Sequence, residues 1–230
     1  MSRTKWIIFI VITLGILVSL VVFSGSSKSD VSKVNTDTIQ AASSENGNIA
    51  DHVSGKADSK VILVEYADYQ CPGCGTIYPL VKSIAEQYKD QIQFVFRNYP
   101  LPELHPNAKV AAGSAEAAGL QGKFWEMHDK IYEKQADWSN LTITERGKFF
   151  EGLATEIGLD INKFNTDLSS PSITEKINFD TALAKKAGVE ATPTFYLNGK
   201  KLESADYGTE AKFKEAIDAA LKKAGVALPQ

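Results

Sequence analysis

The sequence predicts an α/β domain with a helical insertion, preceded by an N-terminal transmembrane or signal segment. Three observations support this expectation. An apolar run follows basic residues at the N-terminus, a strand-helix-strand pattern opens the folded part, and a long helical stretch separates that opening from a β-hairpin and a last helix. With 230 residues, 43% of them apolar, the chain is long enough for one such domain with a sizeable core.

The N-terminal segment predicts a membrane anchor. Arg3 and Lys5 precede an uncharged apolar run over residues 6–23, which at about 1.5 Å per residue crosses most of a bilayer core. Basic residues before such a run favour a cytoplasmic N-terminus. We therefore expect residues 1–23 to place the chain in the cell membrane as a single-pass protein with its domain outside the cytoplasm. A cleaved signal peptide is the alternative, although its apolar region is usually only ~7–15 residues long.

The next segment predicts a flexible linker. Residues 24–58 are rich in Ser, Asn, Asp and Lys and show no sustained apolar period. The folded domain is then expected over residues 59–226.

The opening of the domain predicts a βαβ unit. Residues 61–66 begin with an uninterrupted β-branched run, which is typical of a buried central strand. From Pro72 the apolar residues recur at three- and four-residue steps, so a helix starts there with Pro at its first position. Alternation over residues 91–97 predicts a second strand, parallel to the first.

The remainder predicts an insertion and a closing hairpin. Helical signals fill residues 104–188, including possible capping boxes at Thr142 and Ser172. Asn198-Gly199 between two short apolar segments predicts a β-hairpin, and Thr209 begins a last amphipathic helix. This order of elements is that of a thioredoxin fold interrupted by a helical insertion.

The only two cysteines predict a redox site. Cys71 and Cys74 enclose Pro72 and Gly73 between a strand end and a helix start. Unpaired N–H groups and the helix dipole favour an anion at that position, so Cys71 is expected to be a nucleophilic thiolate with a lowered pKa. Cys74, one turn later, is then the buried resolving thiol. The pair supports thiol-disulfide exchange, which needs no metal and no organic cofactor.

The C-x-x-C pair could also be a zinc site or an inert buried pair. A closed zinc site needs a second pair of ligands at short spacing, whereas His52, His105 and His128 are single and dispersed. An inert buried pair would make the position at a helix start a coincidence.

Two further residues could serve the cysteines. Pro193, preceded by Thr192, could adopt a cis peptide bond in a tight turn facing them, although a trans proline is the commoner case. Glu65 could be buried beneath the motif with a raised pKa and relay a proton to Cys74, or it could be a solvent-exposed carboxylate at a strand end.

Five segments together resemble the DsbA-like thiol-disulfide oxidoreductases, especially their membrane-tethered forms. They are VILVEYADYQCPGC at 61–74, FRNYPL at 96–101, HPNA at 105–108, FWEMHD at 124–129 and ATPTF at 191–195. The resemblance covers residues 61–221.

The resemblance implies an enzyme that passes a disulfide to newly exported proteins and is reset by a membrane redox partner. Cys71 would match the attacking thiol, Cys74 its partner, Pro193 the cis-proline and Glu65 the buried acid. Thr192 would bind an extended substrate segment through its backbone. Strongly oxidising members carry His between the cysteines, whereas this chain has Pro72-Gly73, so the strength of the oxidant is open.

Two alternative functions stay open at this point. The same fold could act as a reductase or isomerase. A chaperone-like domain could instead bind unfolded chains through Tyr69, Ile77 and Tyr78 while the cysteines are idle. A nucleic-acid partner is not expected, because 25 basic and 28 acidic residues are mixed along the chain with a net charge of -3.

Overall fold

The central strand of the computed structural model, which describes residues 29–229, is β2 (Ile62–Ala67). It pairs in parallel with β3 (Gln93–Asn98), and α2 (Pro72–Gln87) connects the two, so the predicted βαβ opening is confirmed. On its other side β2 pairs antiparallel with β4 (Thr194–Leu197), which pairs with β5 (Lys200–Lys201). The sheet order is β1-β3-β2-β4-β5.

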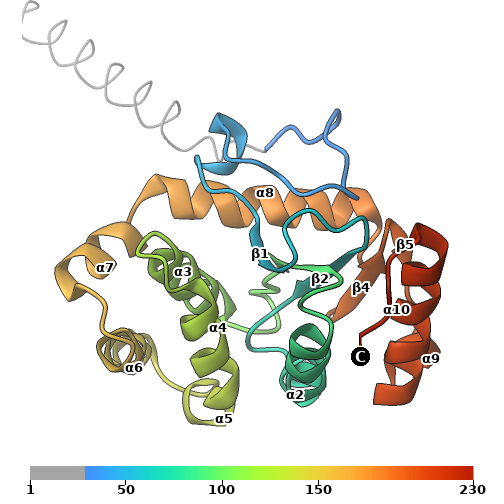
Figure 1. The fold of residues 1–230 in the computed structure, drawn as a ribbon. Helices are drawn as coiled ribbons and strands as arrows, with labels where there is room; N and C mark the ends of the chain where they lie inside the picture. The colour runs from blue at the N-terminus through green and yellow to red at the C-terminus, as the bar shows by residue number, and fades with distance from the viewer. Residues whose placement is uncertain (1–28, 230) are drawn as a thin grey trace, which may run out of the picture.

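Helices cover both faces of this sheet (Figure 1). Along β2 successive side chains point to opposite faces. Leu63 joins the core under α2 and α10, whereas Val64 and Tyr66 join the core under α8. The sheet therefore separates an α2 face from an α8 face.

The predicted helical insertion is confirmed. It consists of α3 (Ala108–Gly119), α4 (Phe124–Glu133), α5 (Gln135–Trp138), α6 (Ile143–Glu156), α7 (Ile161–Leu168) and α8 (Pro171–Ala187). The capping box at Thr142 forms with Glu145, as expected. The one predicted at Ser172 is wrong, because α8 begins two residues earlier than that box requires, with Ser170 as its N-cap and Pro171 in the first position.

The hairpin and the last helix follow the prediction. Asn198 and Gly199 have positive φ values of 48° and 76°, the conformation that a two-residue hairpin turn requires. The Asn198 side chain also accepts a hydrogen bond from the Ile62 N–H at 2.7 Å. After α9 (Ser204–Tyr207), α10 (Glu210–Ala224) begins with the Thr209 side chain accepting a bond from the backbone N–H of Lys212.

The linker predicted over residues 24–58 is wrong for its described part. Residues 52–55 form the edge strand β1 (His52–Gly55), antiparallel to β3, and η1 (Ser44–Asn46) packs on α8. The polar composition of this segment suggested a flexible chain, but side chains of the domain donate hydrogen bonds to its backbone carbonyl groups. Arg97 donates to the carbonyls of Thr36 and Thr38. Lys186 donates to those of Val31, Ser32 and Val34. The domain thus begins well before residue 59.

The anchor predicted for residues 1–23 lies outside the described residues. Within residues 29–229, none of the helices combines the length and the apolar character needed to cross a bilayer.

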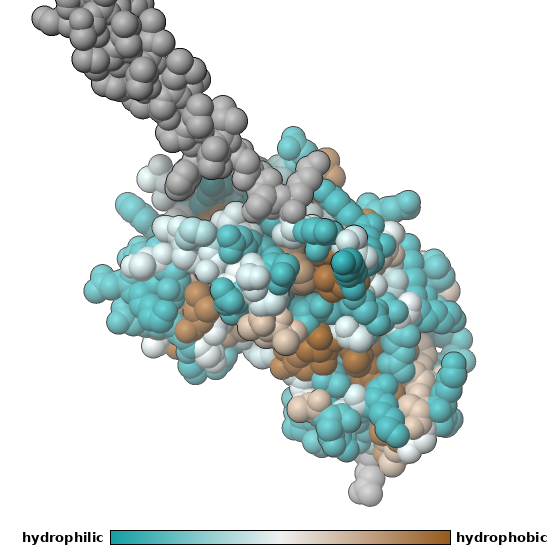
Figure 2. Space-filling view, turned by 90° about the horizontal axis from the view of Figure 1, so that it is seen from above, coloured by the Kyte–Doolittle hydropathy of each residue, from teal (hydrophilic) through white to brown (hydrophobic). Residues whose placement is uncertain are grey.

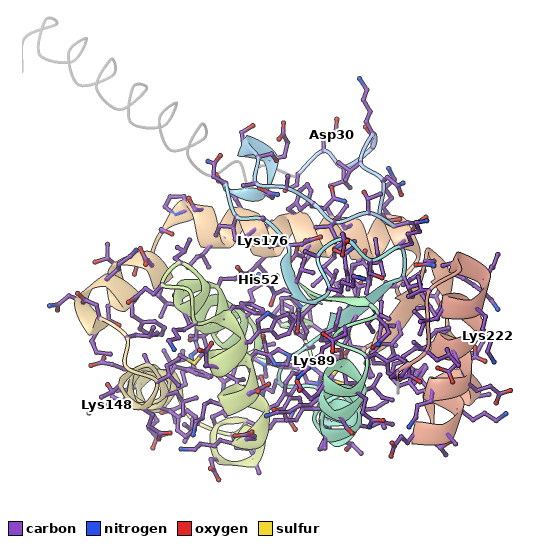
Figure 3. All side chains as sticks on the ribbon, viewed as in Figure 1. Asp30, His52, Lys89, Lys148, Lys176 and Lys222 are labelled. Carbon is purple, nitrogen blue, oxygen red and sulfur yellow. The ribbon has the colours of Figure 1, made fainter. Side chains whose placement is uncertain are left out.

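A buried network of charges holds the α8 face together. Arg97 and Lys176 both pair with Asp51, at 2.7 and 3.1 Å, and Lys176 also pairs with Asp180 at 2.7 Å. Asn98 connects Asp180 to Glu116, and all of these side chains are buried. Figure 3 shows Lys176 and His52 between α8 and the body of the domain. We call Asp51, Arg97, Asn98, Glu116, Lys176 and Asp180 the α8-face network.

The outer surface above this network is different. Seen from the α8 side, it is mostly hydrophilic with small hydrophobic patches (Figure 2). The side chains of the network are buried, and Arg97 donates hydrogen bonds to the N-terminal segment, so the network lies beneath this polar surface.

Candidate active site around Cys71 and Cys74

Cys71 lies at the N-cap of α2, as the sequence predicted. Its backbone is extended, with φ -64° and ψ 123°, and Pro72 occupies the first helical position. The Cys71 N–H donates to the Asp68 carbonyl at 3.0 Å, and the Cys71 carbonyl accepts the first bond of the helix from Gly75 at 3.1 Å. These bonds set the thiol at the positive end of the helix while leaving it partly exposed.

The surroundings of Cys71 favour its thiolate. A hydrogen bond from the Cys74 thiol lowers the pKa of Cys71 to about 5, against burial, with further help from Thr192 and from the backbone N–H groups of Gly73 and Cys74. In the protonated form the Cys71 thiol donates to the Thr192 carbonyl at 3.3 Å. Cys71 is therefore ionised at neutral pH.

Cys74 has the opposite character. It is 1% exposed, and burial raises its pKa well above the usual value, reinforced by Cys71 and, once its carboxyl group ionises, by Glu65. One turn of helix thus separates an accessible thiolate from a buried thiol, and both sulfurs are in the reduced form here.

Glu65 is buried beneath the motif, so of its two interpretations the buried one is correct. Its neighbours across the sheet are Phe96 in β3 and Phe195 in β4, and its exposed fraction is 3%. Burial alone raises the pKa of Glu65 to about 8, with no cationic group offsetting it. The carboxyl group is protonated at neutral pH.

The turn before β4 faces the motif. The Thr192-Pro193 peptide bond is cis, as one of the two expectations had it. A Cβ placed on Gly73 would lie 3.6 Å from Pro193 Cδ and 3.7 Å from Cys71 Sγ. Gly73, Pro193 and Thr192 therefore line the space beside the Cys71 sulfur.

The helical insertion holds the motif loop in a way that the sequence did not indicate. Gln135 Nε2 donates to the carbonyls of Tyr69 and Cys71, at 2.7 and 2.9 Å. The same side chain packs on Gly75 so closely that any Cβ there would overlap it. In the sequence, the only sign of this contact is Gly75 itself, because a position in the first turn of a helix otherwise tolerates most side chains.

Asp68 connects the loop after β3 to the residues that immediately precede the motif. Its buried carboxylate accepts hydrogen bonds from the N–H groups of Gln70 and Leu101, both at 2.8 Å, and contacts His105 Nδ1 at 2.8 Å. Within the described ranges, His, Cys, Asp and Glu side chains form no group of three that could hold a metal ion.

A family model described as thioredoxin matches residues 47–219. The chain belongs to the thioredoxin family. The matched segment begins before β1, which agrees with an N-terminal segment that is part of the domain.

Curated relatives match the same domain. The chain is 37% identical over 161 residues to the Na(+)/H(+) antiporter NhaA 1 of Salinispora arenicola and 35% identical over 161 residues to NhaA 3 of Salinispora tropica. Both alignments cover 70% of this chain but only 23% of the antiporter. The chain thus spans about a quarter of the length of these relatives.

Solved structures give a fuller match. BdbD from Bacillus subtilis, in its oxidised form, is 26% identical with a TM-score of 0.65, covering 81% of this chain and 99% of that one. A thioredoxin-like oxidoreductase from Silicibacter pomeroyi is 26% identical with a TM-score of 0.59, covering 75% and 92%. The α-DsbA1 of Wolbachia pipientis, at 23% identity and a TM-score of 0.66 over 76% and 92%, shares the fold. These matches confirm the predicted thioredoxin-like fold with its helical insertion.

Proposed function

We propose that this protein is a DsbA-like thiol-disulfide oxidoreductase that works outside the cytoplasm and donates the Cys71–Cys74 disulfide to newly exported proteins. The observation that carries the direction is the difference between the two thiols, an accessible Cys71 with a pKa of about 5 and a buried Cys74 with a raised pKa. A stabilised thiolate favours the reduced form of the enzyme and hence makes its disulfide oxidising.

The proposed reaction proceeds through a mixed disulfide. A substrate thiolate attacks Cys71 Sγ, the bond between Cys71 and Cys74 breaks, and the electron pair leaves on Cys74. Glu65 gives its proton to Cys74. A second substrate thiolate then attacks the substrate sulfur and releases Cys71 as a thiolate, so that the substrate gains a disulfide and the enzyme gains two electrons.

Thr192 and Pro193 are proposed to receive the substrate. Their turn lies beside Cys71, and an extended segment pairing with the Thr192 backbone would bring its cysteine to the Cys71 sulfur. Such recognition uses backbone groups and therefore accepts many sequences, as a general disulfide donor requires. The enzyme would then be reset by a membrane redox partner.

The direction is tested by the redox equilibrium of the Cys71–Cys74 pair against a glutathione series, followed by thiol alkylation. A potential near or above about -150 mV supports a disulfide donor, and one near ~-250 mV or lower makes the protein a reductant. A pair that does not equilibrate at all overturns the proposal.

A trapping experiment separates catalysis from chaperone-like binding. Cys74→Ser should accumulate mixed disulfides between Cys71 and exported proteins, because the resolving thiol is missing. The matched control is Cys71→Ser, which keeps one thiol but should trap nothing. Equal yields from both variants, or from neither, would contradict the assigned roles.

The location rests on the apolar run over residues 6–23 with Arg3 and Lys5 before it. In intact cells expressing the full chain, a membrane-impermeant thiol reagent should label Cys71, and the protein should stay in the membrane fraction after a carbonate wash. Labelling that needs cell lysis would place the domain in the cytoplasm. Release of the protein by the carbonate wash would contradict the proposed anchor.

A further inference from the structure

Three buried polar atoms near the motif have no hydrogen-bond partner within residues 29–229: Tyr69 Oη, Tyr132 Oη and His128 Nε2. They belong to one aromatic cluster. Ring centroids are 4.9 Å apart for Tyr69 and Tyr132, 5.1 Å for His128 and Tyr132, and 5.6 Å for Tyr69 and His128. Buried polar groups are nearly always satisfied, so three such atoms together indicate bound water.

The inner end of this trio reaches the redox site. Tyr69, Tyr132 and Cys74 pack in the same buried cluster. Phe96, the strand neighbour of Glu65, contacts Tyr69 and His128 with centroids 5.0 and 4.8 Å away. The charges of Cys74 and Glu65 also act on Tyr132, adding to the burial that raises its pKa.

The outer end, His128, reaches a surface pocket lined by residues of α2 and α4. His128 Nδ1 lies 3.1 Å from Asp129 Oδ1, and Asp129 Oδ2 lies 2.8 Å from Lys82 Nζ. The Asp129 and Lys82 side chains are 31% and 47% exposed. These three residues, with Tyr78, Phe94 and Trp125, line a surface pocket of about 590 Å³.

The hydrogen bonding of His128 suits a relay. Asp129 can only accept, because bonds from His128 and Lys82 outweigh its burial and hold its pKa below the usual value. His128 Nδ1 is therefore the donor, and Nε2, which has no partner among the described residues, is free to accept. Burial lowers the pKa of His128, so the ring is neutral at neutral pH.

We propose that Tyr69, Tyr132 and His128 hold a short chain of buried water that moves protons between the Glu65–Cys74 pair and the pocket at Asp129. The three act on Cys74 through water and Glu65, so they are positioning residues. The inference rests on the proposed function, because it supplies the proton that Glu65 gives to Cys74.

The relay balances in both directions. When Cys74 attacks a mixed disulfide, its proton travels outward: the water chain protonates His128 Nε2 and the Nδ1 proton passes to solvent through Asp129, which leaves His128 with its proton on Nε2. When Cys74 later leaves as a thiolate, Glu65 protonates it, and His128 Nε2 returns a proton to the Glu65 carboxylate through the water chain. His128 Nδ1 then regains a proton from solvent through Asp129, which restores the starting form of the ring. No electron passes through the relay.

The titratable and charged groups around His128 come from four parts of the fold, namely Tyr69 before α2, Tyr78 and Lys82 in α2, His52 in β1, and Asp129 and Tyr132 in α4. Any pH profile of a His128 variant reflects this whole set. The test therefore compares the rates of glutathione exchange with the Cys71–Cys74 redox potential. Both are measured at a single pH and across a range of pH.

The experiment uses the full chain with Cys71 joined to glutathione as a mixed disulfide. Glutathione release by Cys74, and the reverse reaction of the oxidised enzyme with glutathione, are followed by rapid acid quench and mass spectrometry. The variants are Tyr132→Phe and His128→Ala. Tyr88→Phe is the matched control, because it removes a buried hydroxyl that is already bonded to Asp218 at 2.7 Å, away from the motif.

A relay predicts that Tyr132→Phe and His128→Ala slow both directions by the same factor, about tenfold. This is less than the ~10²–10⁴-fold cost of losing a direct acid–base group, because these residues act through water. The Cys71–Cys74 potential should not change, and added imidazole should restore His128→Ala. Rates equal to those of Tyr88→Phe, or a loss with a shifted potential and no imidazole rescue, would overturn the relay. If the unmodified protein releases no glutathione, the proposed function itself fails.

Discussion

The two faces of the sheet handle buried charge in opposite ways. On the α8 face, Arg97 and Lys176 are paired with the carboxylates of Asp51 and Asp180. On the α2 face, Glu65 lies between two phenylalanines without a cation, under a buried thiol. Since β2 and β3 contribute to both faces, strand neighbours one residue apart meet opposite conditions.

The difference teaches what each face is for. A paired buried charge stays ionised and contributes to the uniqueness of the fold, whereas an unpaired one becomes neutral and holds a proton. Burial would raise the pKa of Asp51, but Lys176 and Arg97 outweigh it, so this carboxylate stabilises the fold above its ordinary pKa of 3.8 and stops doing so as pH falls. The contribution of Glu65 to the pH dependence of stability has the opposite sign, because its stabilising effect is lost as pH rises.

The largest expected effect comes from breaking the α8-face network. Arg97→Met leaves Asp51 with one cation fewer in a buried site and removes the bonds to the N-terminal segment, so we expect a loss of ~3–5 kcal/mol in the free energy of unfolding. Urea unfolding measures it. The double variant with Asp51→Leu should recover part of the loss. A single-variant loss below ~1 kcal/mol would show that the network is not a structural element.

A smaller effect with the opposite sign is expected from Glu65→Gln. The folded-state pKa of about 8, against an ordinary value of 4.5, means that stability falls as pH rises from 4.5 to 8. The neutral variant avoids this loss and should be more stable by up to ~3 kcal/mol at pH 7, while disulfide exchange slows. Urea unfolding at pH 4.5 should show no difference. A variant less stable at pH 7 would contradict the unpaired state of Glu65.

A third prediction adds a charge to the α2 side of the molecule. Gly73→His fits, because its Cβ would make ordinary contacts with Pro193 and Cys71. A cation there stabilises the Cys71 thiolate, so we expect a lower Cys71 pKa and a potential higher by ~30 mV, which corresponds to about 1.4 kcal/mol. Gly73→Ala is the uncharged control. A shift of equal size in both variants would mean that backbone conformation, and not charge, sets the potential.

The smallest effect is expected at an exposed ion pair. Glu156 contacts Lys130 and Lys134 on the surface of the insertion, where solvent screens the charges. Glu156→Gln should leave urea unfolding and the redox potential unchanged. It therefore serves as the charge-neutralising control for Glu65→Gln, and a measurable loss would mean that charge removal anywhere in the domain has a cost.

The sequence predicted what depends on local chemistry. Cys71 at a helix start, Pro72 in the first helical position and the Asn198-Gly199 turn follow from the needs of a few consecutive residues, and the structure confirms them. The cis bond at Pro193 was one of two expectations, and the fold decided between them.

Long-range packing explains what the sequence did not predict. Strand β1 has little apolar character of its own and exists because β3 offers it an edge. Asp51 and Arg97 lie 46 positions apart, and nothing near either residue indicates the pair. For Glu65, burial depends on phenylalanines from two other strands, so a strand-end carboxylate and a buried acid look the same in sequence.

The contact between Gln135 and the motif has a consequence for how such chains evolve. The glutamine occupies the space where a side chain at position 75 would be, and it holds two carbonyls of the loop in exchange. A chain that replaces Gly75 must turn this glutamine away from the two carbonyls, and one that shortens the insertion has no need of the glycine. Across relatives, positions 75 and 135 should therefore change together, although 60 residues separate them.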